Sequence, residues 1–358
     1  MLFDPLTIRG LTIRNRVWLP PMCQYSVDAH DGIPTDWHLV HYGARAAGGF
    51  GLMVMEATGV VPEGRISVAD LGLWDDAQID GFARVARFSH TYGAAVGVQL
   101  AHAGRKGSTW PDQPTASAGS QLPDDGGFIT VGPTDEAFPK LAAPRALTTA
   151  EVAAVPWAFA DAARRADAAG LDFVEVHAAH GYLLHQFYSP ISNTRTDAYG
   201  GGFDGRTRLV RETVEAVRRV WPESKPVFVR LSATEWTDDG WSPDDTVRLA
   251  LALKELGADL IDVSSGGNVL TRIPLGPGYQ VGLAERVRRE AGIPTTAVGL
   301  ITEPLQAEQV LRTGQADAVM IGRAGLNNPG WPERAAAALG VATPMAGPYR
   351  RGVLPRPA

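Results

Sequence analysis

Apolar and polar positions alternate along this chain in two regular ways, and the two patterns follow one another from end to end. Eight short runs are almost continuously apolar and rich in valine and isoleucine, as buried strands are. We expect these strands at residues 16–22, 51–60, 94–102, 172–179, 226–233, 260–267, 294–301 and 316–324. Between them apolar residues recur at helical spacing. The pattern predicts a parallel sheet covered by helices.

Capping residues mark several of the expected helices. Ser242 and Pro243 predict a helix start, because serine accepts backbone N–H groups and proline fits the first turn. Thr302 is expected to cap a helix that closes at Gly314. The stretch 148–170 has helical spacing and also ends on glycine, at Gly170.

Eight strand–helix units in succession predict an α/β fold, a (β/α)8 TIM barrel rather than an open sheet. The open-sheet motif G-x-G-x-x-G is missing after the first strand. The repeated LTIR around Gly10 predicts an N-terminal β-hairpin cap within residues 1–16. We expect a single domain over 1–358, with a long active-site loop after strand 3 at 105–146. The tail, 341–358, is expected to be too proline-rich for a helix.

Composition and charge narrow the function. A net charge of −6 argues against a nucleic-acid groove or an anionic-membrane patch. No stretch approaches the length of a membrane span, and the first residues lack a signal-peptide core. The one cysteine excludes an intrachain disulfide, a cysteine-held iron–sulfur cluster and a four-cysteine zinc site. These features lead us to expect a cytoplasmic protein.

Glycines end the seventh and eighth strands, where barrel active sites form. Gly299 and Gly322 leave backbone N–H groups uncovered, and Arg323 adds a fixed positive charge. This combination favours a phosphate site. Tight turns that require glycine are the alternative.

Two histidines and a tyrosine follow the fourth strand. His177 and His180 are candidates for metal ligands, for a hydrogen-bonded core pair, or for a clamp on an oxygen that gains negative charge. A metal site is short of further ligands, so we expect none. Strand positions three apart face opposite sides, so both histidines point inward only if the strand has ended and curled by His180. We favour the clamp, with Tyr182 as general acid.

Five segments together resemble the Old Yellow Enzyme family of FMN-dependent ene-reductases. In chain order they are PPMCQYS, QLAHAGRK, EVHAAHGYLLHQFYSPISNTRTDAYGG, VRLSATEWTDDGW and GRAGLNNP. The cysteine in the first segment and the ending PYRRG are similar to the subclass called thermophilic-like.

The resemblance implies a non-covalently bound FMN across the barrel mouth. Its phosphate would lie on Gly299, Gly322 and Arg323. The other cofactor-binding residues that it implies are Pro20, Pro21, Met22, Cys23, Ala57, Gln99, Lys106 and Arg230. A solvated loop lysine is the alternative for Lys106.

The resemblance also implies the reaction. NADPH reduces the flavin, and an activated alkene (an enone, enal or maleimide) then binds at the same place and accepts hydride, in ping-pong order. His177 and His180 hold the substrate carbonyl, Tyr25 contacts the substrate, and Tyr182 protonates the α-carbon. A homodimer or dimer-built tetramer is implied, in which Arg351 matches an arginine that enters a neighbouring subunit's site, although Val353 replaces the usual aromatic residue.

Two other functions are weighed against this one. A Schiff-base aldolase needs a lysine inside the barrel, and Lys106 alone lies just beyond a strand end. A flavin storage or sensor protein would bind FMN but would have no use for two histidines and a tyrosine in register.

Overall fold

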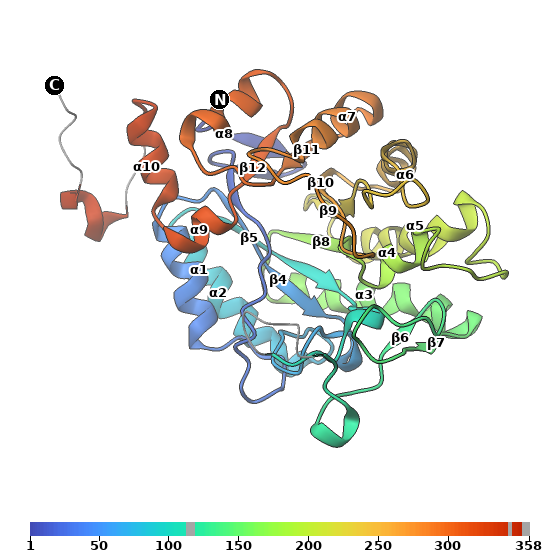
Figure 1. Cartoon of the computed structure of the whole chain (residues 1–358). Helices are drawn as coiled ribbons and strands as arrows, with labels where there is room; N and C mark the ends of the chain where they lie inside the picture. Colours follow the sequence, from blue (N-terminus) through green and yellow to red (C-terminus); the bar gives the residue numbers. More distant parts are fainter. Residues whose placement is uncertain (112–118, 343–345, 353–358) are drawn as a thin grey trace.

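The computed structural model describes residues 1–111, 119–342 and 346–352. Eight parallel strands close into a barrel in the order β10-β11-β12-β3-β4-β5-β8-β9 (Figure 1). In chain order they are β3 (Val17–Leu19), β4 (Leu52–Gly59), β5 (Ala95–Ala101), β8 (Phe173–Ala178), β9 (Val227–Ser232), β10 (Leu260–Ser264), β11 (Thr295–Ala297) and β12 (Ala318–Met320). The expected barrel is confirmed, with strands that end earlier than expected at several exits.

Helices surround the barrel and cover its outer face (Figure 1). They are α1 (Asp36–Ala47), α2 (Ile79–Thr91), α3 (Thr149–Ala168), α4 (Leu183–Tyr188), α5 (Phe203–Val220), α6 (Pro243–Glu255), α7 (Val281–Ala291), α8 (Pro304–Arg312), α9 (Arg323–Asn327) and α10 (Trp331–Ala338). Ser242 caps α6 as expected, since its hydroxyl accepts from the Asp245 N–H. The expected cap at Thr302 is wrong: Pro304 fixes the first turn of α8, so Glu303 is the N-cap.

Apolar side chains fill the half of the barrel interior that lies toward the N-terminal ends of the strands. Trp18 stacks on Phe228 with ring centroids 5.9 Å apart, and Phe173 lies 4.7 Å from Phe228. The expected hairpin, β1 (Leu6–Ile8) with β2 (Leu11–Ile13), is antiparallel and packs Ile8 and Ile13 against the same cluster. The hairpin and this cluster therefore close the floor of the barrel interior, and the interior opens at the carboxyl ends of the strands.

Two segments have more structure than expected. The loop 105–146 contains 3-10 turns and a small sheet of β6 (Val131–Gly132) with β7 (Arg145–Ala146), apart from the barrel in Figure 1. Its residues 112–118 lie outside the described part. In the tail a 3-10 helix spans Gly347–Gly352, which corrects the expected non-helical tail. Val353 lies outside the described residues.

Candidate active site

A cavity of about 350 Å³ opens at the carboxyl ends of the strands. Its size falls in the range of small-molecule sites. The residues proposed from the sequence that line it are Pro20, Pro21, Met22, Arg230, Gly299, Gly322 and Arg323. Residues from four segments that are far apart in the sequence therefore share one cavity, because parallel strands present their carboxyl ends at the same rim.

Glycine is explained by different factors at Gly299 and Gly322, the two glycines at this rim. Gly299 has φ 124°, a conformation that other residues rarely adopt, so its turn alone explains it. Gly322 has φ −81°, and a Cβ there would meet only ordinary contacts, 3.5 Å from Pro20 and 3.7 Å from Met22. Packing does not require glycine at Gly322, and the open space beside its backbone favours close approach of a ligand. Arg323 is exposed and has no carboxylate partner among the described residues, so its charge is free to bind an anion.

His177, His180 and Tyr182 converge beside this cavity. Strand β8 ends at Ala178, and His180 has φ 60°, so the chain has left the strand and curled, as expected. The His177 ring lies 5.2 Å from the His180 ring and 5.1 Å from the Tyr182 ring, measured between centroids. The two histidines are linked to the cavity by its own lining residues. His177 is the register partner of Arg230, and His180 Nε2 lies 2.7 Å from Ser264 Oγ.

Burial sets the protonation of these three groups. It lowers the pKa of His177 and of His180 well below the ordinary value, and nearby Arg230 lowers both further. Burial likewise raises the pKa of Tyr182, with Cys23 and Asp70 adding to the effect. Near neutral pH the imidazoles are therefore uncharged, with one N–H donor each, and the phenol keeps its proton.

Lys106 is a structural neighbour of this turn and not a solvated loop lysine. Its Nζ donates to the carbonyl oxygens of His180 at 2.7 Å and of Gly267 at 2.8 Å. It also lies 5.0 Å from the centre of the Tyr182 ring. Burial lowers the pKa of Lys106 to about 8, with Arg105 acting in the same direction.

A second group of residues proposed from the sequence gathers beside Tyr182. Cys23, Tyr25 and Tyr182 pack on an apolar cluster that contains Ala57. Burial, together with Asp70 and Glu56, raises the pKa of Cys23 well above the ordinary value, so the sulfur is a neutral thiol. Burial and the neighbouring Cys23 also raise the pKa of Tyr25. Cys23 therefore offers polarisable contact rather than a nucleophilic thiolate.

Two acidic residues inside the barrel were not proposed from the sequence. Arg230 Nε lies 2.9 Å from Asp262 Oδ2, although the N–H is not aligned for a hydrogen bond, and Gln99 Nε2 donates to Glu175 Oε1 at 2.8 Å. Asp262 also accepts from Thr296 Oγ1 at 2.6 Å. Each is an acidic residue within an otherwise apolar strand, and this pattern in the sequence could have identified Asp262 and Glu175 as candidates. The guanidinium of Arg230 is thus paired with the buried side chain of Asp262.

Glu175 makes stability depend on pH. Burial, with nearby Asp262, raises its pKa from 4.5 to about 8 despite Arg230. The folded protein therefore holds a proton that the unfolded chain releases, and stability falls as pH rises from about 4.5 to 8. Between these two pH values we expect the free energy of unfolding of Glu175→Gln to rise relative to that of the wild type, by up to about 1.4 kcal/mol per pH unit. Urea unfolding at pH 5.5, 6.5 and 7.5 in a fixed excess of FMN measures this; parallel curves for the two proteins would contradict it.

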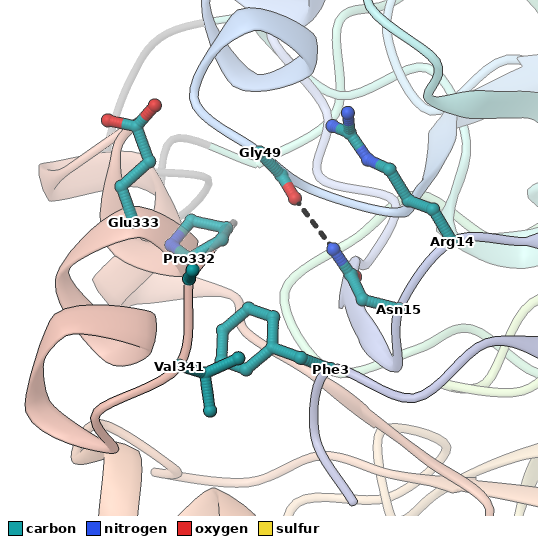
Figure 2. Close-up of a pocket in the computed structure, with 8 residues that line it drawn as sticks. Phe3, Arg14, Asn15, Gly49, Pro332, Glu333 and Val341 are labelled. Carbon is teal, nitrogen blue, oxygen red and sulfur yellow. Dashed lines mark hydrogen bonds between the residues drawn. The ribbon is translucent and has the colours of Figure 1, made fainter. Parts of the chain in front are cut away.

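Another cavity, of about 210 Å³, lies at the opposite end of the barrel (Figure 2). Asn15 and Gly49, which precede β3 and β4, face Pro332 and Glu333 of α10 across it. The Asn15 side chain donates to the Gly49 carbonyl at 2.9 Å. It is remote from the histidines, at the end of a barrel where residues serve stability.

Arg351 does not join the site within this chain: it lies exposed in the tail helix. In the described part of the chain no three His, Cys, Asp or Glu side chains converge as metal ligands.

Comparison with known proteins identifies the family of this chain. Residues 1–341 match the model of the NADH:flavin oxidoreductase / NADH oxidase family. The NADPH dehydrogenase of Geobacillus thermodenitrificans (strain NG80-2) is 48% identical over 352 residues, which cover 98% of each chain.

Two solved structures share the fold. Morphinone reductase is 29% identical, with a TM-score of 0.77, over 95% of this chain and 90% of its own. The old yellow enzyme homologue from Zymomonas mobilis is 27% identical, with a TM-score of 0.79, over 96% of this chain and 94% of its own. The chain therefore belongs to the NADH:flavin oxidoreductase / NADH oxidase family, the Old Yellow Enzyme family that its motifs resemble, and is a flavin oxidoreductase with FMN as its cofactor.

Proposed function

We propose that this enzyme uses NADPH to reduce the C=C bond of activated alkenes such as enones, enals and maleimides, in ping-pong order. The observation that carries the proposal is the convergence of His177, His180 and Tyr182 beside the cavity that holds Arg230. The names of similar proteins support it, since one is an NADPH dehydrogenase and another is morphinone reductase.

The residues of the cavity fit FMN. The unpaired Arg323 and the open backbone at Gly322 suit a phosphate, and Arg230 supplies a fixed cation deeper in the cavity. Cys23, Ala57, Gln99 and Lys106 would complete the contacts around the ring system. When bound, FMN supplies the chemistry of accepting hydride from NADPH and passing it to the alkene.

His177 and His180 would bind the carbonyl oxygen of the substrate. As neutral imidazoles, each can direct one N–H at an oxygen without adding a charge that repels Arg230. In the described part of the chain no group hydrogen-bonds the His177 side chain, and its Nδ1 is buried without a partner. A preorganised pair of donors of this kind stabilises an oxygen that gains negative charge. Tyr25, which packs on the same apolar cluster as Tyr182, would also contact the substrate.

Tyr182 would deliver the proton. Its raised pKa keeps the phenol protonated, and its ring lies 5.1 Å from that of His177 between centroids, so the proton would lie near a carbonyl held by His177. We expect Tyr182→Phe to slow reoxidation by 2-cyclohexenone by about 10²-fold or more, because phenylalanine keeps the ring and loses the proton. Flavin reduction by saturating NADPH, which needs no proton from Tyr182, should change little. Stopped-flow absorbance of both steps tests this; equal slowing of the two would contradict the role.

The test of the function itself is anaerobic stopped-flow absorbance of the wild-type holoprotein. NADPH should bleach the flavin band, and 2-cyclohexenone should restore it. If NADPH bleaches the band and neither cyclohexenone, an enal nor a maleimide restores it, the alkene-reductase proposal fails and another acceptor must be sought.

We also infer a cytoplasmic homodimer or dimer-built tetramer formed by a single FMN-binding domain. The exposed position of Arg351 is compatible with insertion into a neighbouring subunit. Light scattering of the purified protein tests the association, and a monomer would refute it. No helix in the described ranges is both long enough and apolar enough to span a bilayer.

A further inference from the structure

The turn that carries His180 and Tyr182 is strained and is held by a buried side chain. His180 and Gly181 are consecutive left-handed residues, with φ 60° and 74°. Such a conformation persists in a non-glycine residue only where the surroundings fix it. The Gly181 N–H donates to Nδ1 of His185, in the first turn of α4, at 2.9 Å. The His185 side chain thus fixes the Gly181 amide, which lies between the site residues His180 and Tyr182.

This contact fixes the tautomer of His185. A neutral imidazole has one acceptor nitrogen and one N–H. Because Nδ1 accepts from Gly181, the proton must be on Nε2, which lies 3.1 Å from Glu235 Oε1. The N–H is not well aligned with that oxygen, so the contact is weaker than a well-aligned hydrogen bond. Both side chains are fully buried.

Protonation of the pair agrees with this geometry. Burial lowers the pKa of His185, and attraction to Glu235 offsets only part of that effect. Burial acts to raise the pKa of Glu235, but the contact with His185 and the hydrogen bond from the Trp241 N–H outweigh it and lower the pKa to about 2. The imidazole is therefore neutral and the carboxylate ionised near neutral pH.

Glu235 connects this anchor to two further strand exits. Its Oε1 accepts from Asn268 Nδ2 at 2.7 Å, and its Oε2 accepts from the Trp241 N–H at 2.7 Å. Asn268 follows β10, whereas Glu235 follows β9. The adjoining Gly267 packs against the turn so tightly that a Cβ there would lie 2.6 Å from the Cα of His180. The turn therefore has little room to shift while the pair is intact.

We propose that His185 and Glu235 are positioning residues, which set the direction of His180 and Tyr182 through the Gly181 amide. The proposal rests on the proposed function for the roles of His180 and Tyr182. Neither His185 nor Glu235 lines the cavity, so both act through the turn.

Two substitutions of His185 separate anchoring from packing. His185→Asn places Oδ1 near the position of Nδ1 and keeps an acceptor for the Gly181 N–H, whereas His185→Leu keeps bulk and removes the acceptor. In His185→Leu we expect hydrogen exchange of the Gly181 amide to become at least about 10-fold faster. Reoxidation by 2-cyclohexenone should slow by about 10- to 100-fold, because small misplacement of reacting groups is costly. His185→Asn should recover both values to within about 3-fold of the wild type.

Controls in the same holoproteins exclude a general loss of structure. Flavin content, reduction by saturating NADPH and reoxidation by ferricyanide, which needs no carbonyl clamp or proton, should stay near wild-type values. If His185→Leu shows wild-type Gly181 exchange and wild-type reoxidation by the enone, the proposal is overturned. It is also overturned if His185→Asn is as impaired as His185→Leu, since the acceptor would then not matter.

Glu235→Gln provides a second route if His185→Leu does not fold. One amide oxygen cannot satisfy all three donors around Glu235, so Gly181 exchange should again accelerate and enone reoxidation should slow. Unchanged exchange in Glu235→Gln would overturn the proposal. Failure of the proposed function would look different: the wild-type flavin would not be reoxidised by enones, while the Gly181 exchange rates would still test the anchor.

Discussion

The His177→Ala/His180→Ala variant should still be reduced by NADPH, but 2-cyclohexenone should reoxidise it at least about 10²-fold more slowly than the wild type. Both imidazoles are neutral and their rings lie 5.2 Å apart, so together they offer two N–H donors to one oxygen. Alanine removes both donors and leaves water to fill the space. Stopped-flow absorbance of the separate half-reactions measures the effect.

Two controls support the reading of that result. Ferricyanide accepts electrons without a carbonyl clamp, so it should reoxidise the double variant at the wild-type rate. Single alanine variants should show less than additive effects, because residues that act as one unit are non-additive. Recovery of the double variant with the enone at the wild-type rate would remove the histidines from the proposed mechanism.

Replacement of Arg230 is expected to have the largest effect on stability. Arg230→Met leaves the carboxylate of Asp262 buried without its cation, whereas Glu175, with a pKa raised to about 8, stays protonated at neutral pH. An uncompensated buried charge of this kind costs about 3–5 kcal/mol of unfolding free energy. FMN should be lost as well, because the cavity loses its interior cation. Denaturant unfolding and the flavin content of the purified protein are the measurements.

The matched control is Arg230→Met/Asp262→Asn. Asparagine removes the stranded charge and can still accept from Thr296 Oγ1, so the double variant should regain much of the unfolding free energy without regaining FMN. An Arg230→Met protein within about 1 kcal/mol of the wild type would contradict the argument, since it would show that Asp262 is not an uncompensated charge there.

Local sequence patterns predict much of the fold. The eight apolar runs predict eight strands, and their order in the chain is their order around the barrel. The Ser242 cap was predictable because the capping bond joins residues three apart. Thr302 was misassigned because two polar residues precede Pro304, and the proline decides which of them is the cap. The end of β8 before His180 was also predictable, from the requirement that both histidines face inward.

The barrel, the strand exits that carry the site and the family can all be inferred from the sequence, because periodicity, turn residues and motifs are local properties. Which buried polar groups meet depends on the three-dimensional packing of the chain. Lys106 reaches the carbonyl of Gly267, 161 residues away, and Arg230 pairs with Asp262. Glu235 holds His185 beneath the Gly181 turn. These contacts depend on the register in which the strands close the barrel. No single segment encodes that register, because it is set by packing of the whole interior.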